Sequence, residues 1–279
     1  MGTPAEEAVI PGAGGKLRCI EAGLFDGLDA VMMCHAAARD ILETTVAART
    51  VLNLEFFGKA AHAGADPHQG LNALTAAVQT LNGLNGLYQQ LTPGHRINAI
   101  VTDGGKVVNV IPEHAALAVQ LRAPTRAELD RLKEKILDCA RAGALMTGCR
   151  FTAEEPSPAV SDLVPSRPLL ETYAASAQRL GVSPVRELET CISTDAGTVS
   201  HHLPCIHPFF AVGCDPGLEL HSRAFAEACG RETAFRQLCT AAKILALTGY
   251  EVLSDPELRR RIRDEFLSRT NRTNSTRSF

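Results

Sequence analysis

The stretch TVLNLEFFGKAAHAG, from Thr50 to Gly64, decides the fold of the middle of the chain. Apolar and polar residues alternate in its first half, which predicts a strand from about residue 49 to residue 57 with one face in a core. A glycine and small residues follow, and they predict a turn that carries His62. The small neighbours of His62 would let another group approach it closely. The simpler interpretation is a turn histidine without a chemical role.

The segments that follow extend this strand into a unit. Residues 71–91 have leucines and a valine at helical spacing, and residues 96–124 read as two or three strands. Residues 125–148 have the pattern of an amphipathic helix, and residues 149–155 have that of one more strand. The order β-α-β-β-α-β predicts a ferredoxin-like α+β domain over residues 49–156.

The segments on either side predict a second domain, of α/β class. The apolar run LDAVMMCHA, Leu28–Ala36, is expected to be a buried strand that ends in Cys34-His35, and helix and strand alternate from Leu169 to Gly249. The simplest architecture joins these segments in one α/β domain, into which the ferredoxin-like unit is inserted as a lid. The expected parts are residues 1–48, 49–156, 157–255 and 256–279, the last being a terminal helix and tail.

Composition argues against several function classes. The formal net charge is -3, so no broad basic field favours nucleic acid as a partner. No run of about 18 apolar residues occurs, which argues against a membrane partner. The nine cysteines are scattered without a CxxC pair, as expected for reduced thiols. A cytoplasmic protein is therefore expected, and the same reasoning fits the nucleus.

Acidic and histidine side chains provide the candidate chemistry. Glu6 and Glu7 stand side by side in GTPAEE, where a solvated surface turn is the alternative to a metal site. A metal that neutralises one glutamate would let the other accept a proton, with a pKa raised by its neighbour. His35 and His221 stand at a strand end and in a turn-rich stretch, and imidazole is a common ligand of divalent metals. Any single histidine is more often an ordinary core or surface residue.

The stretch STDAGTVSHH, Ser193–His202, gathers hydroxyls, an acid and glycine after an expected strand. It is either a hydrogen-bonding loop or a helix start with Asp195 as N-cap. The sequence contains no GxSxG or P-loop pattern, so serine-hydrolase and NTPase chemistry lack support. The remaining group of possible zinc ligands, whose spacing fits no established template, consists of His201, His202, Cys205 and His207.

The motifs GTPAEE, GKAAHAG, NVIPE, STDAG and LHSRAF occur in this order and span nearly the whole chain. With them, the sequence resembles the aminoacylase/carboxypeptidase-type metallopeptidase and amidohydrolase family, and most of all its branch of Xaa-Arg (β-alanyl-lysine) dipeptidases. The resemblance implies an α/β, di-metal aminopeptidase-like catalytic domain with an inserted α+β lid that dimerises. It also implies an upstream Cys/His motif that this chain lacks, so the catalytic domain and the metal pair are expected to be incomplete.

The resemblance also implies residue roles. Glu6 is expected to be the general base, and His62 to reach the partner subunit's site and stabilise the oxyanion. The ligands implied for zinc or manganese are Glu7, His35 and His221. The substrate contacts implied are Asn98, Asn109, Thr194, Asp195 and Gly197. The function implied is hydrolysis of β-alanyl or basic-residue dipeptides by a homodimer formed through the lid. The alternative is a catalytically impaired form that acts as a dimerising or binding protein.

Overall fold

Residues 14–275 are described by the structure, a computed structural model. Within this range, the side chains of residues 189–191 and 271–275 are not described. The expected general base Glu6 and the expected ligand Glu7 therefore lie outside the described residues.

Two compact units make up the described chain. Unit 1 contains Ala47–Asp162, and unit 2 contains Lys16–Val46 together with the residues from Leu163 onward. No helix in the described part of either unit is long and apolar enough to cross a membrane.

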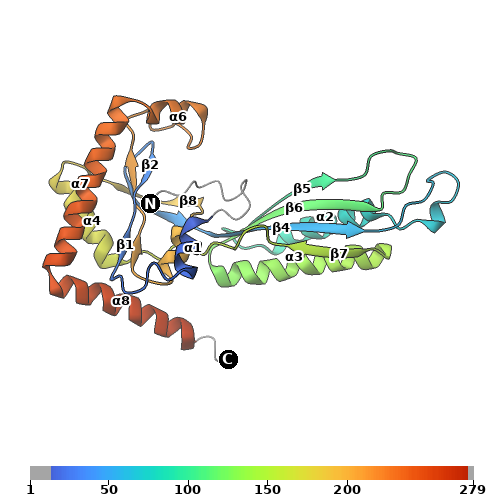
Figure 1. The fold of residues 1–279 in the computed structure, drawn as a ribbon, viewed down its shortest axis with the longest axis horizontal. Helices are drawn as coiled ribbons and strands as arrows, with labels where there is room; N and C mark the ends of the chain where they lie inside the picture. The colour runs from blue at the N-terminus through green and yellow to red at the C-terminus, as the bar shows by residue number, and fades with distance from the viewer. Residues whose placement is uncertain (1–13, 276–279) are drawn as a thin grey trace. The chain divides into compact units, whose positions relative to one another are not determined.

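Unit 1 is an antiparallel sheet covered by two helices. Its elements are β4 (Ala48–Phe57), α2 (Ala73–Leu87), β5 (Arg96–Asp103), β6 (His114–Ala123), α3 (Arg126–Thr147) and β7 (Arg150–Glu154). The strands follow the order β5-β6-β4-β7 across the sheet. Helices α2 and α3 pack against each other and both contact β4 and β6 (Figure 1). This is the β-α-β-β-α-β order that the sequence predicts.

The alternation in β4 and β6 builds the core of unit 1. Every second side chain of β6 is buried, and Leu52, Leu54 and Phe56 of β4 are at most 1% exposed. These side chains share one apolar cluster with Leu129 and Ile136 on the buried face of α3. Removing each such side chain from water contributes about 1.5–3 kcal/mol. The core therefore fixes which face of the sheet the helices cover.

Helices α2 and α3 approach each other most tightly at Gly143. A Cβ atom there would lie 2.6 Å from the Ala76 carbonyl oxygen and 2.6 Å from Thr80 Oγ1. Because these distances are far below ordinary contact, the helices would have to separate. Gly143→Ala is therefore expected to lower the free energy of unfolding by about 1–3 kcal/mol, despite the better helix propensity of alanine. Denaturant unfolding measures the change.

Gly86→Ala is the matched control for this substitution. Gly86 also lies in a helix of unit 1, but a Cβ atom there would meet nothing within 4 Å. Alanine is expected to raise the free energy of unfolding at this position by up to about 1 kcal/mol. Equal changes for the two variants would show that the contact at Gly143 can relax without cost.

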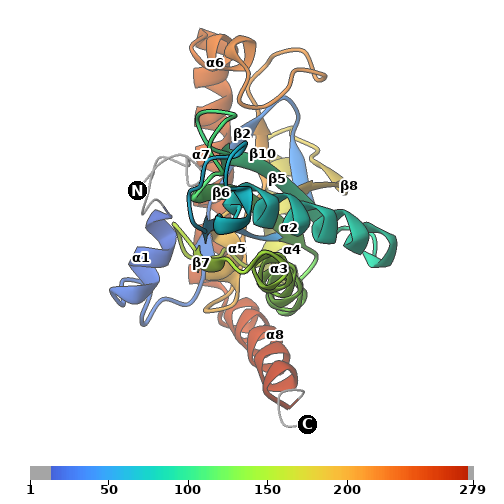
Figure 2. The ribbon, with the colours of Figure 1, turned by 90° about the vertical axis from the view of Figure 1, so that its right-hand side faces the viewer.

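Most strand pairs of unit 2 are parallel, and one pair in its larger sheet is antiparallel. β1 (Val31–Met32) pairs with β9 (Cys205–Ile206), and a second sheet has the order β2-β10-β3-β8. The strands of that sheet are β2 (His35–Ala37), β10 (Phe209–Ala211), β3 (Ile41–Val46) and β8 (Val185–Ile192). The helices are α1 (Gly15–Glu21), α4 (Arg167–Arg179), α5 (Ala196–Ser200), α6 (Arg223–Cys229), α7 (Glu232–Ser254) and α8 (Pro256–Ser275). Helices α4 and α7 pack together, and α8, which follows α7, contacts both (Figures 1 and 2).

The apolar run Leu28–Ala36 does not form the single strand expected from the sequence, because β1 and β2 are separate. The partner segment is interrupted at the same level by His207 and Pro208. Proline has no N–H to donate to a ladder, so the pairing stops there. The strand pairing resumes where the His35 N–H donates to the Pro208 carbonyl at 3.0 Å. This interruption places His35 and His207 next to each other.

Candidate active site

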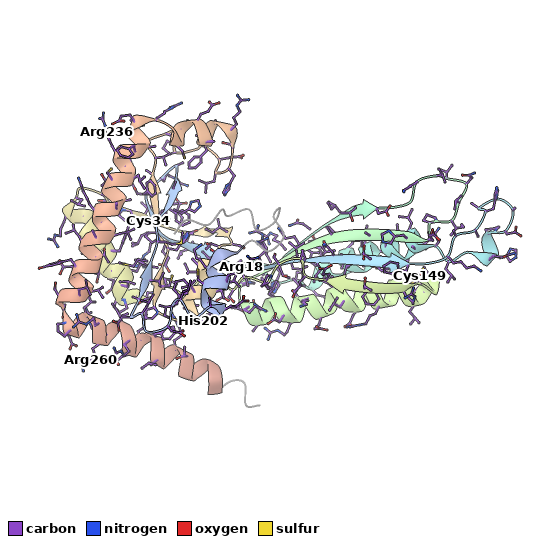
Figure 3. All side chains as sticks on the ribbon, viewed as in Figure 1. Arg18, Cys34, Cys149, His202, Arg236 and Arg260 are labelled. Atoms are coloured by element: carbon purple, nitrogen blue, oxygen red, sulfur yellow. The ribbon has the colours of Figure 1, made fainter. Side chains whose placement is uncertain are left out.

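The interrupted ladder brings two imidazoles together in unit 2. The ring centroids of His35 and His207 lie 5.9 Å apart, with 36° between the ring planes. Both rings also contact the Phe209 ring, at centroid distances of 5.5 and 5.0 Å. Cys34, labelled in Figure 3, directly precedes His35 and marks this part of the unit. Because all three rings contact one another, each limits the rotation of the others.

His221 supplies a further imidazole. It belongs to the segment between β10 and α6, and its ring centroid lies 6.3 Å from that of His35. Its φ is 62°, and it is the one residue other than glycine with a positive φ in the described chain. This backbone conformation is uncommon for a residue with a side chain and occurs often at functional sites. Two of the residues expected as metal ligands, His35 and His221, are thus neighbours. His35, His207 and His221 are called the histidine cluster below.

One ring nitrogen of His35 is engaged by the backbone. Its Nδ1 lies 2.7 Å from the Ala36 carbonyl oxygen. Since a carbonyl only accepts hydrogen bonds, Nδ1 carries the hydrogen, and Nε2 of the neutral ring keeps its lone pair. Histidines that bind metals commonly donate their other N–H in this way. His35 is therefore held in the tautomer that a metal ligand needs.

His207 is a buried imidazole without a hydrogen bond. The residue is 4% exposed, and neither ring nitrogen has a partner in the part of the chain that the structure describes. Burial, with a smaller effect from the nearby His35, lowers the pKa of His207 to about 3. The ring is therefore neutral at physiological pH and keeps a lone pair.

The thiol of Cys34 is a poorer metal ligand than the imidazole of His35, the next residue. Burial raises the pKa of Cys34 to about 11, and its Sγ lies 3.3 Å from the Tyr173 hydroxyl oxygen. Metals bind the thiolate form, which this burial disfavours. Neutral imidazole is therefore the kind of metal ligand that this part of unit 2 provides.

The histidine cluster fits the chemistry of a divalent metal only as a partial ligand set. Neutral imidazoles suit zinc and several other divalent ions. Within residues 14–275, however, no three histidine, cysteine, aspartate or glutamate side chains are placed to hold a metal ion as they stand. Glu7, the expected carboxylate ligand, lies outside that range. The cluster supplies nitrogen donors, and a complete site requires further ligands.

The loop expected to contact substrate also lies in unit 2, and it is largely buried. Asp195 is 3% exposed and accepts hydrogen bonds from the Lys16 backbone N–H, at 3.2 Å, and from the Lys16 ammonium. It occupies the N-cap position of α5, as one interpretation of the sequence expects, but its side chain makes no capping hydrogen bond there. Gly197 is buried in α5, while Thr194 is half-buried and its Oγ1 accepts from the Ala196 N–H at 3.3 Å. The carboxylate of Asp195 thus joins the start of α1 to this loop.

In unit 1 the structure brings His62 and Asn109 together. His62 pairs with Val110 in an antiparallel bridge, and the Ala63 N–H donates to the Asn109 carbonyl at 2.9 Å. Asn98, the other contact expected in this unit, lies elsewhere on edge strand β5, with its side chain exposed. The turn of His62 and the loop of Asn109 therefore form one local surface, to which Asn98 does not belong.

The ring of His62 is exposed but held by the backbone. Its Nδ1 accepts from the N–H groups of Gly64 and Ala65, at 3.2 and 3.1 Å. A backbone N–H can only donate, so Nδ1 must accept, and the neutral ring carries its hydrogen on Nε2. An oriented N–H on an exposed ring is suited to donate to an oxygen that becomes negatively charged.

Sequence reasoning named His207 only in a group of possible zinc ligands and did not connect it with His35. In the sequence it stands in a group whose other members lie apart from the histidine cluster: His201 and His202 (labelled in Figure 3) are exposed, and Cys205 is buried in β9. The signal that could have found it is Pro208, because a proline inside an apolar strand marks an interruption of pairing.

Comparisons with known proteins connect this geometry to a family. A family model described as the peptidase dimerisation domain matches residues 50–145, which lie in unit 1. The chain is 37% identical over 270 residues to the Xaa-Arg dipeptidase of Mus musculus and 36% identical over 271 residues to that of Homo sapiens. Each match covers 95% of this chain and 61% of the relative, so the chain spans about three-fifths of the length of these relatives.

A solved structure shows the same fold. The aminobenzoyl-glutamate utilization protein from Klebsiella pneumoniae superposes with a TM-score of 0.63 at 22% sequence identity. The superposition covers 82% of this chain and 56% of that chain. At this identity the likeness concerns the fold alone, and the fold agrees with the α/β architecture and α+β lid that the sequence predicts.

Proposed function

We propose that this chain, which is 36–37% identical to two Xaa-Arg dipeptidases and matches the peptidase dimerisation domain over residues 50–145, hydrolyses peptide or amide bonds in small dipeptides with the help of a divalent metal. The observation that carries the proposal is the pairing of His35 with His221, which come from distant parts of the chain. The relatives compared above are dipeptidases, which favours hydrolysis over the alternative of a non-catalytic dimerising protein.

In this proposal, residues of the chain bind the metal, transfer the protons and stabilise the oxyanion. A bound metal would supply Lewis acidity at the scissile carbonyl, with Glu7, His35 and His221 as its ligands. Glu6 takes a proton from water as the water oxygen bonds to the carbonyl carbon. Glu6 then passes that proton to the leaving amine as the C–N bond breaks. His62 of the partner subunit donates its Nε2 hydrogen to the carbonyl oxygen while negative charge develops there.

The proposed substrates are dipeptides that contain a basic residue. Two relatives are named for Xaa-Arg dipeptides, and the sequence motifs resemble the branch that acts on β-alanyl-lysine. Asn98, Asn109 and Thr194 are the proposed direct contacts, since each has an exposed or half-buried side chain. Asp195 and Gly197 are buried, so they would act by shaping their loop.

The proposed assembly is a homodimer formed through unit 1. The dimerisation-domain match lies in this unit, and β5 is an edge strand on which Ile100 and Val101 are exposed. An unpaired strand edge with apolar side chains is a ready pairing surface. Zinc and manganese both suit the proposed ligands. The eight cysteines with described side chains are free thiols, which supports a reducing location such as the cytoplasm or the nucleus.

Turnover of Xaa-Arg and β-alanyl-lysine dipeptides by the purified chain is expected to require added zinc or manganese. His35→Ala is expected to weaken metal affinity at least about tenfold, because an imidazole ligand is lost. His202→Ala is the matched control, since His202 is an exposed histidine outside the histidine cluster. Dipeptide assays with and without a chelator, together with metal content per chain, measure both effects. Turnover that survives chelation would rule out the proposed metal centre.

A further inference from the structure

A cavity of about 420 Å³ lies in unit 1, beside the turn that carries His62. The connection between β5 and β6 forms most of its lining, together with Ala60. Two of the lining residues also hold the turn, since Val110 pairs with His62 and the Ile111 N–H donates to the Ala61 carbonyl at 2.9 Å. Small-molecule sites commonly have volumes of about 300–1,000 Å³. A ligand in contact with His62 would therefore lie next to a cavity that can take part of it.

The walls of the cavity are aliphatic and partly open to solvent. Val107 is 57% exposed and Val110 is 38% exposed, and Ile111 and Pro112 complete this apolar lining. Exposed apolar side chains gathered in one loop are typical of a surface that contacts a ligand or another protein. Aliphatic walls suit the methylene stem of a lysine or arginine side chain, which packs along apolar surface while its charged end stays in polar surroundings.

Two carboxylates line the same cavity. One oxygen of Asp103 accepts from the Gly105 N–H at 3.1 Å, and the other lies 2.7 Å from His114 Nδ1, which must donate to it. The hydrogen bonds from His114 and Gly105 lower the pKa of Asp103, so this carboxyl is charged at physiological pH. The second carboxylate is that of Glu113, an exposed residue. Against these two, the lining contains one ammonium, that of Lys106, which gives a net charge of -1 when His114 is neutral.

We propose that this cavity binds the basic side chain of the dipeptide whose scissile carbonyl contacts His62, and that Asp103 and Glu113 select a lysine or arginine side chain. The carboxylates pair with the cationic end, while the aliphatic walls contact the stem. Because His62 is proposed to act in the partner subunit's site, the cavity adds a specificity pocket to that site. This inference rests on the function proposed above and extends it, since the direct substrate contacts proposed there are uncharged side chains.

Two matched dipeptides test the inference on the complete chain with added zinc or manganese. β-Alanyl-norleucine has the same four-carbon side chain as β-alanyl-lysine but lacks the ammonium group. The unchanged chain is expected to have a kcat/KM at least about tenfold higher for the lysine dipeptide. Glu113→Gln and Asp103→Asn are each expected to lower this preference about threefold to tenfold, mainly through KM, and the double variant by about the product. Turnover of the norleucine dipeptide should stay nearly unchanged.

Glu134→Gln is the matched control, because Glu134 is an exposed glutamate on α3 of the same unit and does not line the cavity. It should keep the full preference. Added salt should reduce the preference of the unchanged chain, because exposed charges are screened. Thermal unfolding checks that Asp103→Asn, which loses a charged partner of His114, still folds. Calorimetry measures binding of both dipeptides independently of turnover.

Each outcome decides the inference. If Glu113→Gln and the double variant are folded and keep the full preference, other residues select the basic side chain, and the inference is wrong while the proposed function stands. The same holds if the unchanged chain hydrolyses both dipeptides equally, or if Glu134→Gln lowers the preference as much as Glu113→Gln. If neither dipeptide is hydrolysed, the proposed function fails and calorimetry decides the inference. Tighter binding of the lysine dipeptide that is lost in the double variant would then support it, and equal binding or none would overturn it.

Discussion

Glu6→Gln is expected to lower turnover by about 10²–10⁴-fold and to leave metal affinity nearly unchanged. Glutamine has the shape of glutamate but cannot accept the proton of the attacking water. Glu6 is proposed as the base because it stands directly before Glu7, the proposed ligand, in the motif GTPAEE. Steady-state kinetics on an Xaa-Arg dipeptide, with metal titration of the same preparation, measure the two quantities separately.

Glu7→Gln is the matched control for this experiment, because it makes the same chemical change at the neighbouring position. It removes a charged metal ligand, so it is expected to weaken metal binding as well as turnover. The two glutamates therefore differ in which measurement they affect. Full turnover in the Glu6→Gln chain would exclude Glu6 as the base, and a loss of metal affinity there would reassign it as a ligand.

Unit 1 is the part of the fold that the sequence predicts best, and local patterning explains why. Alternation in β4 and β6 and the helical spacing of α2 and α3 are each set by residues close in sequence, and the short connections leave few ways to join them. In unit 2 the same reasoning expects one strand over Leu28–Ala36. That expectation fails because the interruption is caused by Pro208, which lies between the partner strands β9 and β10, far along the chain.

The candidate site depends even more on contacts that no local pattern contains. The resemblance proposes His35 and His221 as ligands, but only the folded chain shows their rings 6.3 Å apart. The sequence leaves Asp195 as either a loop acid or an N-cap, and the structure places it at the N-cap position of α5 while pairing its carboxylate with Lys16, 179 residues away. His207 is similar, because its place beside His35 follows from strand register rather than from its neighbours in sequence.

His62→Ala is expected to lower turnover by about 10²–10³-fold without changing metal affinity, because it removes one donor to the developing oxyanion. The hydrogen bonds from Gly64 and Ala65 to Nδ1 leave Nε2–H as the donor, and alanine abolishes it. His68→Ala is a suitable control, since His68 is an exposed histidine in the η1 turn Pro67–Gln69 of the same unit. An equal loss in the two variants would indicate a general disturbance of this surface.

Mixing inactive chains tests whether His62 serves the partner subunit, as the resemblance implies. His62→Ala chains and Glu6→Gln chains are each expected to be nearly inactive alone. In a two-fold dimer of one chain of each kind, one composite site combines an intact Glu6 with the partner subunit's intact His62. Random mixing in equal amounts forms hybrids in half of the dimers, and half of the sites in each hybrid are complete, so about a quarter of the unchanged activity should return. If hybrids form and no activity returns, each site uses its own His62, and dimerisation through unit 1 has no direct part in catalysis. The amount of activity that returns therefore decides whether unit 1 acts only in assembly or also completes the site across the interface.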